Sequence, residues 1–279
     1  MANNMSYPLT PGGPDHYPVH PGSMLLTLVE PHKGYERAYN RWYERDHFYG
    51  GCLEGEYCIS GARWVATREL KDLRWPQETD AAEPYDAGSF VAIYWVLAGH
   101  HDDWQRWSVP QLNKLYSNGR GFAERTHIHT NMYNYLGADY RDADPVPLTL
   151  ALDRHFTGLV VMWFDGLDDR APTESLEKLR AELLPALLAN SDLEIAATFA
   201  PIRPPADQPP PQTPVKMGAG PGGPTRFCQL FFTDKDPKAS LEALHAYAQA
   251  IERSGVARLS LAAPFTKTII GTDTYVDQL

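Results

Sequence analysis

The chain has 279 residues, of which 43% are hydrophobic and 22% charged, a composition typical of a globular protein with a sizeable core. Its formal net charge of −10 disfavours any binding that depends on neutralising phosphates, so we expect no nucleic-acid partner. No apolar run approaches the roughly 20 residues that a membrane helix needs, and no membrane partner is expected either.

The N-terminal segment 1–22 is polar and rich in proline and glycine. It lacks the basic start and the apolar stretch of a signal peptide, so we interpret it as a flexible arm. The cysteines Cys52, Cys58 and Cys228 contain no CxxC pair, and an odd number gives no disulfide framework. Both observations predict a cytoplasmic protein with reduced thiols.

Hydrophobic patterning predicts a first half, residues 23–150, in the order strand, helix, strand, strand, helix, strand. The strands are expected at 24–29, 59–70, 90–97 and 126–135, and the helices at 34–49 and 108–118. Pro110 is expected in the first turn of the second helix, where its missing N–H is not needed.

The same order recurs in the second half, residues 151–279. Its strands are expected at 157–164, 193–201, 227–232 and 258–263, and its helices at 173–189 and 238–254. Thr173 is expected to cap the first of these helices, and Gly255 to end the second. The segment 204–225 is too rich in proline and glycine for regular structure and is predicted to be a loop.

Both halves therefore follow the βαββαβ order of the ferredoxin-like unit, and the predicted fold class is α+β with two such units in tandem. A ferredoxin-like sheet has helices on one face only and must bury the other. We expect the two bare faces to pack together as an α/β barrel within one chain, with a cavity between them. Loop 204–225 and the tail beyond Phe265 would then be lids over the cavity mouths, or else plain surface loops.

The polar chemistry of the chain is concentrated on the helix segment Tyr39 to His47. A stripe at 3–4 spacing is mostly aromatic and ends in ionisable groups: Tyr35, Ala38, Tyr39, Trp42, Tyr43, Asp46 and His47. Buried ionisable groups are unfavourable unless paired, so the end of the stripe should face a cavity or a partner. His47 can exchange a proton near neutral pH, and Tyr43 lies one turn away. A core histidine bonded to a backbone carbonyl is the alternative.

The strand 126–135 (THIHTNMYNY) supplies a second polar group. Strict alternation places His127, His129, Asn131, Tyr133 and Tyr135 on one face, which we expect to line the cavity. The two histidines of the HxH pair could share a metal ion with Glu30 or His47. A full ligand set is not evident, and no metal or cofactor is assigned.

The second half has plainly apolar strands, among whose residues Trp163 is a candidate wall of the cavity. It has no counterpart of His47 on its first helix. The first half is therefore predicted to carry the site. No GxSxG, P-loop, zincin or dinucleotide-binding fingerprint is present in the sequence.

The segment from Tyr39 to Val65 resembles the EthD-like branch of the dimeric α/β-barrel superfamily. Members commonly have a helix with Trp-Tyr and a histidine four residues after the tyrosine, matched here by Trp42, Tyr43 and His47. A following strand motif is matched by residues 61–64, whereas the proline that members usually have shortly after the histidine is missing. The resemblance implies a ferredoxin-like fold paired across a barrel. It implies no single reaction, because relatives include cofactor-free monooxygenases, lactone isomerases, polyketide cyclases, haem peroxidases and haem dehydratases.

These features predict a cofactor-independent acid–base enzyme of the lyase, isomerase, dehydratase or cyclase type, acting on a small apolar or aromatic molecule between the two sheets. The candidate catalytic residues are His47, Tyr43, His129 and His127, and the candidate substrate-binding residues are Tyr39, Trp42, Asn131, Tyr133 and Trp163. The alternatives are a haem- or metal-dependent oxidoreductase and a non-catalytic carrier of an apolar ligand. A homodimer stays open, since tandem halves would complete the barrel without one.

Overall fold

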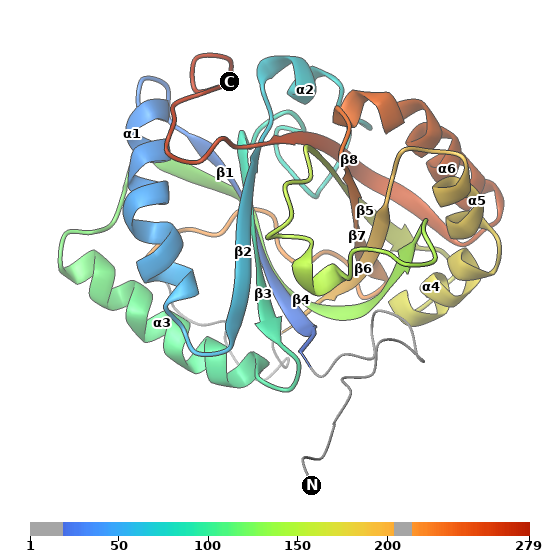
Figure 1. Cartoon of the computed structure of the whole chain (residues 1–279), viewed down its shortest axis with the longest axis horizontal. Coiled ribbons are helices and arrows are strands. Elements are labelled where there is room, and N and C mark those ends of the chain that lie inside the picture. The colour runs from blue at the N-terminus through green and yellow to red at the C-terminus, as the bar shows by residue number, and fades with distance from the viewer. Residues whose placement is uncertain (1–18, 204–213) are drawn as a thin grey trace, which may run out of the picture.

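Eight strands form one closed barrel in the computed structural model, which describes residues 19–203 and 214–279 (Figure 1). Every neighbouring pair is antiparallel, and the order around the barrel is β1-β3-β2-β8-β5-β7-β6-β4. The strands are β1 Pro21–Pro31, β2 Cys58–Val65, β3 Phe90–Leu97, β4 Arg125–Tyr140, β5 Gly158–Gly166, β6 Ile195–Pro201, β7 Arg226–Thr233 and β8 Ala257–Lys267. The α+β class predicted from the sequence is confirmed.

Two seams join the strands of the two halves of the chain. The first four strands are adjacent in the order β4-β1-β3-β2, and the last four in the order β8-β5-β7-β6. At one seam β4 pairs with β6 from Tyr133 to Tyr140, whereas at the other only Trp64 and Val65 of β2 pair with β8. The barrel is therefore closed over a long seam on one side and over only two residue pairs on the other.

Helices cover the barrel on two sides (Figure 1). The helices of the first half are α1 Glu36–Trp42, α2 Arg68–Asp72 and α3 His101–Ser117, and those of the second half are α4 Pro172–Ala181, α5 Leu183–Ala189 and α6 Leu241–Arg253. Each group buries one side-chain layer between itself and the outer face of the sheet. In the described part of the chain, no helix combines the length and apolar character needed to cross a membrane.

The barrel interior is filled by side chains, where the sequence predicted a cavity. Trp64, Trp95 and Trp163 are fully buried there, and Trp95 stacks on Phe199 with ring centres 5.5 Å apart. Loop residues from both ends join the same apolar cluster: Ala81, Ala82, Leu148, Leu152 and Phe156. An eight-stranded barrel is only wide enough for its own side chains, and this one is packed accordingly. The expected binding space between the two sheets is therefore not supported.

Several element boundaries differ from the sequence predictions for local reasons. The predicted strand 59–70 ends at Val65, because the helix-favouring residues that follow form α2. Helix α3 begins at His101, so Pro110 lies inside the helix and not in its first turn. The predicted helix 173–189 is two helices, interrupted at Glu182, and it begins at Pro172 with Ala171 and not Thr173 at the N-cap.

Two predicted irregular segments are described only in part. Residues 1–18 of the predicted N-terminal arm lie outside the described residues, and β1 already begins at Pro21. Residues 204–213 of loop 204–225 also lie outside them, but Ala219 donates its N–H to the carbonyl oxygen of Ile128 at 2.7 Å, so the described part crosses one barrel mouth. The three cysteines carry free thiols.

The C-terminal tail does not cover a barrel mouth. It leaves β8 after Lys267 and runs along α1 (Figure 1). Asn40 donates its side-chain amide to the carbonyl oxygen of Thr272 at 2.9 Å, and Arg41 forms a two-pronged ion pair with Asp273. Val276, only 7% exposed, completes the apolar layer beneath α1. The tail therefore fixes α1 against the sheet.

Candidate functional site

A β-bulge in β4 decides where the predicted site residues lie. The register between β1 and β4 shifts so that His129 faces Leu28 while His127 faces Val29. Leu28 belongs to the barrel interior and Val29 to the helix-covered layer. The two histidines therefore lie on opposite faces of the sheet, and the prediction of one shared face is wrong. The extra residue of the bulge is Ile128.

The HxH metal hypothesis fails for the same reason. One histidine points into the barrel and the other out of it, so the two rings cannot bind one ion. Across residues 19–203 and 214–279, no group of three or more histidine, cysteine, aspartate or glutamate side chains is arranged to hold a metal.

The inner group of predicted residues is a closed hydrogen-bond network. The His129 Nδ1 donates to the carbonyl oxygen of Ala81 at 3.0 Å, which leaves its Nε2 to accept from the Tyr133 hydroxyl at 2.5 Å. Trp163 donates its indole N–H to the same hydroxyl at 3.0 Å. Asn131 donates to the carbonyl oxygen of Ala219 at 3.1 Å, and its side-chain nitrogen lies 3.0 Å from His129 Nε2.

This network holds two loops across a barrel mouth. Ala81 belongs to the loop before β3 and Ala219 to the loop before β7. His129, Tyr133 and Trp163 are fully buried, and burial lowers the pKa of His129 to about 4. Both ring nitrogens are already used, so the network explains His129 as a structural residue.

The outer group lies beneath a helix with unusual geometry. After Trp42 the chain continues as two π-helical segments, Tyr43–His47 and Tyr49–Leu53. Such turns are rare and are frequently found at functional sites. They displace the side chains that follow Trp42 from the positions of a regular α-helix, and His47 lies within the first of them.

Tyr39 and Tyr43 form the floor of this outer layer. Both are buried, and the Tyr43 hydroxyl hydrogen-bonds the Tyr94 hydroxyl at 2.8 Å. Burial raises the pKa of Tyr39 to about 12 and that of Tyr43 well above its ordinary value. The Tyr43 hydroxyl therefore points at the sheet and stays protonated, which suits packing better than proton transfer.

His47 differs from the other two histidines because its ring nitrogens have no hydrogen-bond partner in the described residues. Its imidazole stacks on Trp42 with ring centres 4.5 Å apart and meets the edge of Tyr43 at 5.2 Å. Desolvation, with smaller contributions from Arg125 and His127, lowers the pKa of His47 to about 3. The imidazole of His47 is therefore neutral at neutral pH. It is partly exposed, and its ring nitrogens accept and donate no hydrogen bond within the described residues.

Arg125 and His127 lie beside it at the start of β4. His127 Nε2 accepts from the Arg125 Nε at 3.2 Å, and its Nδ1 donates to the Thr130 hydroxyl at 2.8 Å. Burial and then the charge of Arg125 lower the pKa of His127 to about 3. Arg125 also donates to the Phe122 carbonyl oxygen and to the Tyr116 hydroxyl, and its guanidinium lies 4.8 Å from the centre of the Trp42 ring.

A second buried arginine underlies the same layer. The Arg63 guanidinium lies 4.3 Å from the centre of the Tyr43 ring, donates to Asn40 at 3.1 Å and meets a Glu44 oxygen at 3.5 Å. Sequence reasoning missed Arg125 and noted Arg63 only within the family resemblance. Strand alternation could have found Arg63, because Ala62 and Trp64 on either side of it face the barrel interior.

The His47 ring packs directly against Gly51, which has no side chain to displace it. Substitution of Gly51 is therefore expected to destabilise the protein more than substitution of its neighbour Gly50. A Cβ on Gly51 would lie 2.6 Å from His47 Cε1 and Nδ1, whereas a Cβ on Gly50 would first meet the flexible end of Arg120 at 2.8 Å. We expect Gly51→Ala to force the imidazole off Trp42 and lower the free energy of unfolding by about 1–3 kcal/mol. Gly50→Ala should change it by less than about 1 kcal/mol. Urea denaturation of both variants measures the difference, and equal effects would contradict the role of Gly51.

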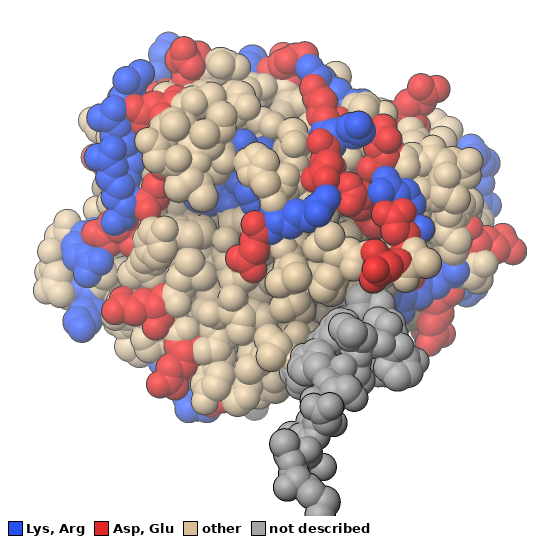
Figure 2. All heavy atoms as spheres, viewed as in Figure 1, with Lys and Arg blue, Asp and Glu red and all other residues tan. Residues whose placement is uncertain are grey.

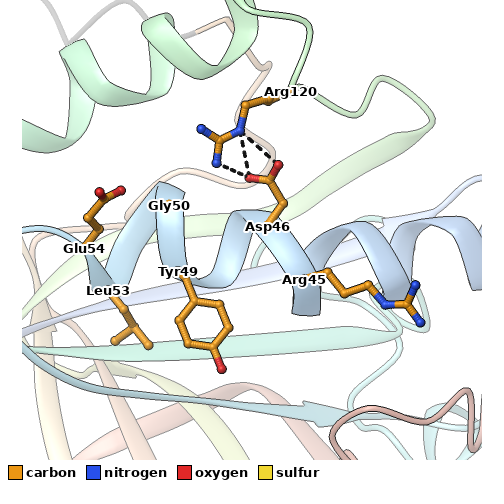
Figure 3. Close-up of a pocket in the computed structure, with 7 residues that line it drawn as sticks. All are labelled: Arg45, Asp46, Tyr49, Gly50, Leu53, Glu54 and Arg120. Carbon is orange, nitrogen blue, oxygen red and sulfur yellow. Dashed lines mark hydrogen bonds and ion pairs between the residues drawn. The ribbon is translucent and has the colours of Figure 1, made fainter.

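A surface pocket of about 530 Å³ lies on the outer side of the π-helical segments. Its lining is Arg45, Asp46, Tyr49, Gly50, Leu53, Glu54 and Arg120. Figure 3 shows the side chains of Asp46 and Arg120 pointing toward each other, and they form a two-pronged ion pair with a shortest distance of 2.7 Å. The Arg120 guanidinium lowers the pKa of Asp46. His47 does not line this pocket; the ion pair instead ties the His47 segment to the loop before β4.

Comparison with known proteins supports the fold but no family. No family model matches the sequence, and no curated protein matches it. Among solved structures, an anthrone oxidase-like protein matches with a TM-score of 0.54 at 11% identity, over 90% of this chain and 95% of that one. A chlorite dismutase-like protein matches with a TM-score of 0.54 at 12% identity, over 92% and 98%. The haem-bound R244L variant of Rhodococcus jostii RHA1 DypB matches with a TM-score of 0.50 at 8% identity, over 89% and 93%. The chain therefore shares its overall fold with these solved structures.

The side chains present do not fit a haem. The layer beneath α4, α5 and α6 is packed with leucine and phenylalanine, and His245 of α6 instead stacks on Trp75 with ring centres 3.7 Å apart. In the layer beneath α1, the His47 ring packs against Trp42 and Gly51. A porphyrin plane would have to displace these groups, so we derive no chemistry through it.

Proposed function

We propose that the protein is a small-molecule enzyme whose proton-transfer site lies around His47, between the π-helical segments and the outer face of the sheet. The observation that carries this proposal is the unpartnered imidazole of His47 beside a buried guanidinium. The reaction class is the one predicted from the sequence, a lyase, isomerase, dehydratase or cyclase acting on an aromatic or largely apolar molecule. The proposed site around His47 lies outside the barrel, because the barrel interior, where the sequence predicted the site, is filled by side chains.

The surroundings of His47 support binding of an aromatic molecule. His47 and Phe122 both stack on the Trp42 ring, and all three side chains are partly exposed. Tyr39 and Tyr43 behind them are buried. Aromatic walls with a few placed polar groups are the usual composition of small-molecule sites.

The chemistry of His47 supports a role as proton acceptor. A neutral imidazole with a free nitrogen is already in its basic form at neutral pH. Its low pKa makes it a weak base towards water, and protonation becomes favourable only when negative charge forms nearby. Transfer of a proton from a carbon acid to His47 leaves a negatively charged enolate and a positively charged imidazolium. The two charges would form together, with the enolate beside Arg125.

We also propose the finer family relationship and domain division. Each half is inferred to be a ferredoxin-like unit, residues 23–150 and 151–279, supported by the matching strand orders β4-β1-β3-β2 and β8-β5-β7-β6. The EthD-like branch is supported by Trp42, Tyr43 and His47 lying together in one layer. A cytoplasmic location is supported by the three free thiols.

Proton abstraction can be tested without knowing the substrate, because a carbon acid exchanges its proton with solvent. We expect the protein to speed hydrogen–deuterium exchange at the acidic carbon of 2-tetralone in D₂O, followed by NMR. His47→Gln should slow the catalysed exchange by roughly 100-fold or more, the usual contribution of a general base. His155→Gln, at an exposed position, is the matched control. Exchange that survives His47→Gln would contradict the proposal, and binding without any exchange would indicate a carrier.

A further inference from the structure

The layer around His47 is more cationic than its surroundings. The protein carries a net charge of −10, and exposed charges of both signs alternate over the face in Figure 2. Arg125 is only 9% exposed, yet in the described residues no carboxylate lies within ion-pair distance of it. By contrast, the buried Arg226 has both Asp80 and Asp165 as ion-pair partners. A buried cation without a counter-charge is unfavourable, and a bound anion would relieve it.

The hydrogen bonds of Arg125 leave donors available. A guanidinium has five N–H groups. Arg125 uses three of them, towards His127, the Phe122 carbonyl oxygen and the Tyr116 hydroxyl. None of these acceptors carries a formal charge. The three bonds fix the guanidinium in place over Trp42 while two N–H groups stay free for a ligand.

We infer that the occupant of this site carries an anionic oxygen, held by Arg125 beside Trp42, and that its binding places a proton on His47. The inference rests on the proposed location of the site and specifies the ligand class. Without an anion, the positive charge of Arg125 opposes protonation of His47. A bound anion neutralises that charge. The proton comes from solvent and bonds to a ring nitrogen of His47 that has no other partner, so charge and atoms balance.

The groups around His47 support this coupling. The charged and titratable groups that act on it from the neighbouring elements are Asp46 on its own segment, Arg125 and His127 on β4, and Arg63 on β2. Asp46 alone favours the charged imidazole, and its carboxylate is already engaged by Arg120. Arg125, His127 and Arg63 all disfavour it. An anion placed next to Arg125 therefore offsets the largest charge interaction that disfavours the protonated imidazole.

Calorimetric titration with benzoate and its neutral isostere benzamide tests the inference. We expect benzoate to bind at least tenfold more tightly at pH 6, because a charge-assisted bond to a guanidinium is stronger than a neutral one. The benzoate affinity should fall by up to tenfold per pH unit as the pH rises from 6 to 8, since one proton is taken up with each anion. In buffers of different ionisation enthalpy, the measured heat should report that proton directly.

Variants separate the two residues. Arg125→Met should abolish the preference for benzoate, and Arg125→Lys, which keeps the charge, should retain part of it if the methionine variant does not fold. His47→Gln should keep the preference but remove the proton uptake. Arg258→Met, at a position whose side chain is 67% exposed, is the control.

Three results would overturn the inference: equal binding of benzoate and benzamide, undiminished preference in folded Arg125→Met, or proton uptake that persists in His47→Gln. Its failure is distinguishable from failure of the proposed function. Tetralone exchange that depends on His47, without any benzoate preference, overturns the inference alone. Coupled benzoate binding without any exchange overturns the enzymatic proposal alone.

Discussion

Acidification from pH 7 to pH 4 is expected to unfold the protein, because three largely desolvated histidines, His47, His127 and His129, resist protonation in the folded state. Burial lowers the pKa of His47 and His127 to about 3 and that of His129 to about 4. In the unfolded chain each has an ordinary pKa of about 6.5. Below that value the unfolded state binds more protons than the folded state, so stability is fully present above pH 6.5 and falls as the pH drops.

The expected effect is large. Near pH 5 the unfolded chain binds up to three more protons at these sites, which corresponds to a slope of about 4 kcal/mol per pH unit. Domains of ordinary stability have about 5–15 kcal/mol to lose. Urea denaturation followed by circular dichroism at pH 7, 6 and 5 measures the slope. Carboxylates paired with arginine add to it only at lower pH.

Single substitutions measure how much each histidine contributes to the pH dependence of the free energy of unfolding. His129→Gln should reduce it by about 1.4 kcal/mol per pH unit, the value for one proton. His47 and His127 interact, so their effects should not add simply. His155→Gln, at an exposed position, should leave the slope unchanged. Stability that is flat between pH 7 and 5 would show that these rings are hydrated in solution.

The order of elements could be predicted from the sequence, and the faces of the sheet only in part. Apolar strands and amphipathic helices are local patterns, so the eight strands were found in the right order. The bulge at Ile128 is not local: its carbonyl oxygen accepts from Ala219, which is far away in the sequence. One extra residue reverses which side chains face inward. His127 and His129 were therefore grouped together although the sheet separates them.

The main residues of the aromatic helix stripe were predicted correctly, but the stripe faces the outer surface of the sheet and not a cavity inside the barrel. Tyr39, Tyr43 and His47 do lie in one layer. A helix that packs on a sheet directs its apolar stripe at the near face, so the sheet itself separates these residues from the barrel interior. The burial of Arg125 was missed because it lies at the first residue of β4, where no alternation of apolar neighbours marks it, whereas alternation around Arg63 could have revealed that residue.

Replacing Lys267 by methionine is expected to stabilise the protein. Lys267 is 8% exposed at the end of β8, and burial lowers its pKa to about 8. Below pH 8 the amine is charged in both states, and the shift from about 10.5 corresponds to about 3 kcal/mol of lost stability. Its amine lies 3.9 Å from the centre of the Trp64 ring and donates to the Leu152 carbonyl oxygen at 3.3 Å. These contacts offset part of the loss, so the expected gain at pH 7 is about 1–2 kcal/mol.

The pH dependence distinguishes this explanation from a general gain in packing. Between pH 8 and 9.5 the folded chain releases the Lys267 proton before the unfolded chain does, so the stability of the wild-type protein should rise with pH. Lys267→Met should lack that rise, and its advantage should shrink over the same range. Lys235→Met, at an exposed position, should behave like the wild type. A Lys267→Met protein that is less stable at pH 7 would mean that the contacts to Trp64 and Leu152 outweigh desolvation, and that the lysine holds the barrel end closed.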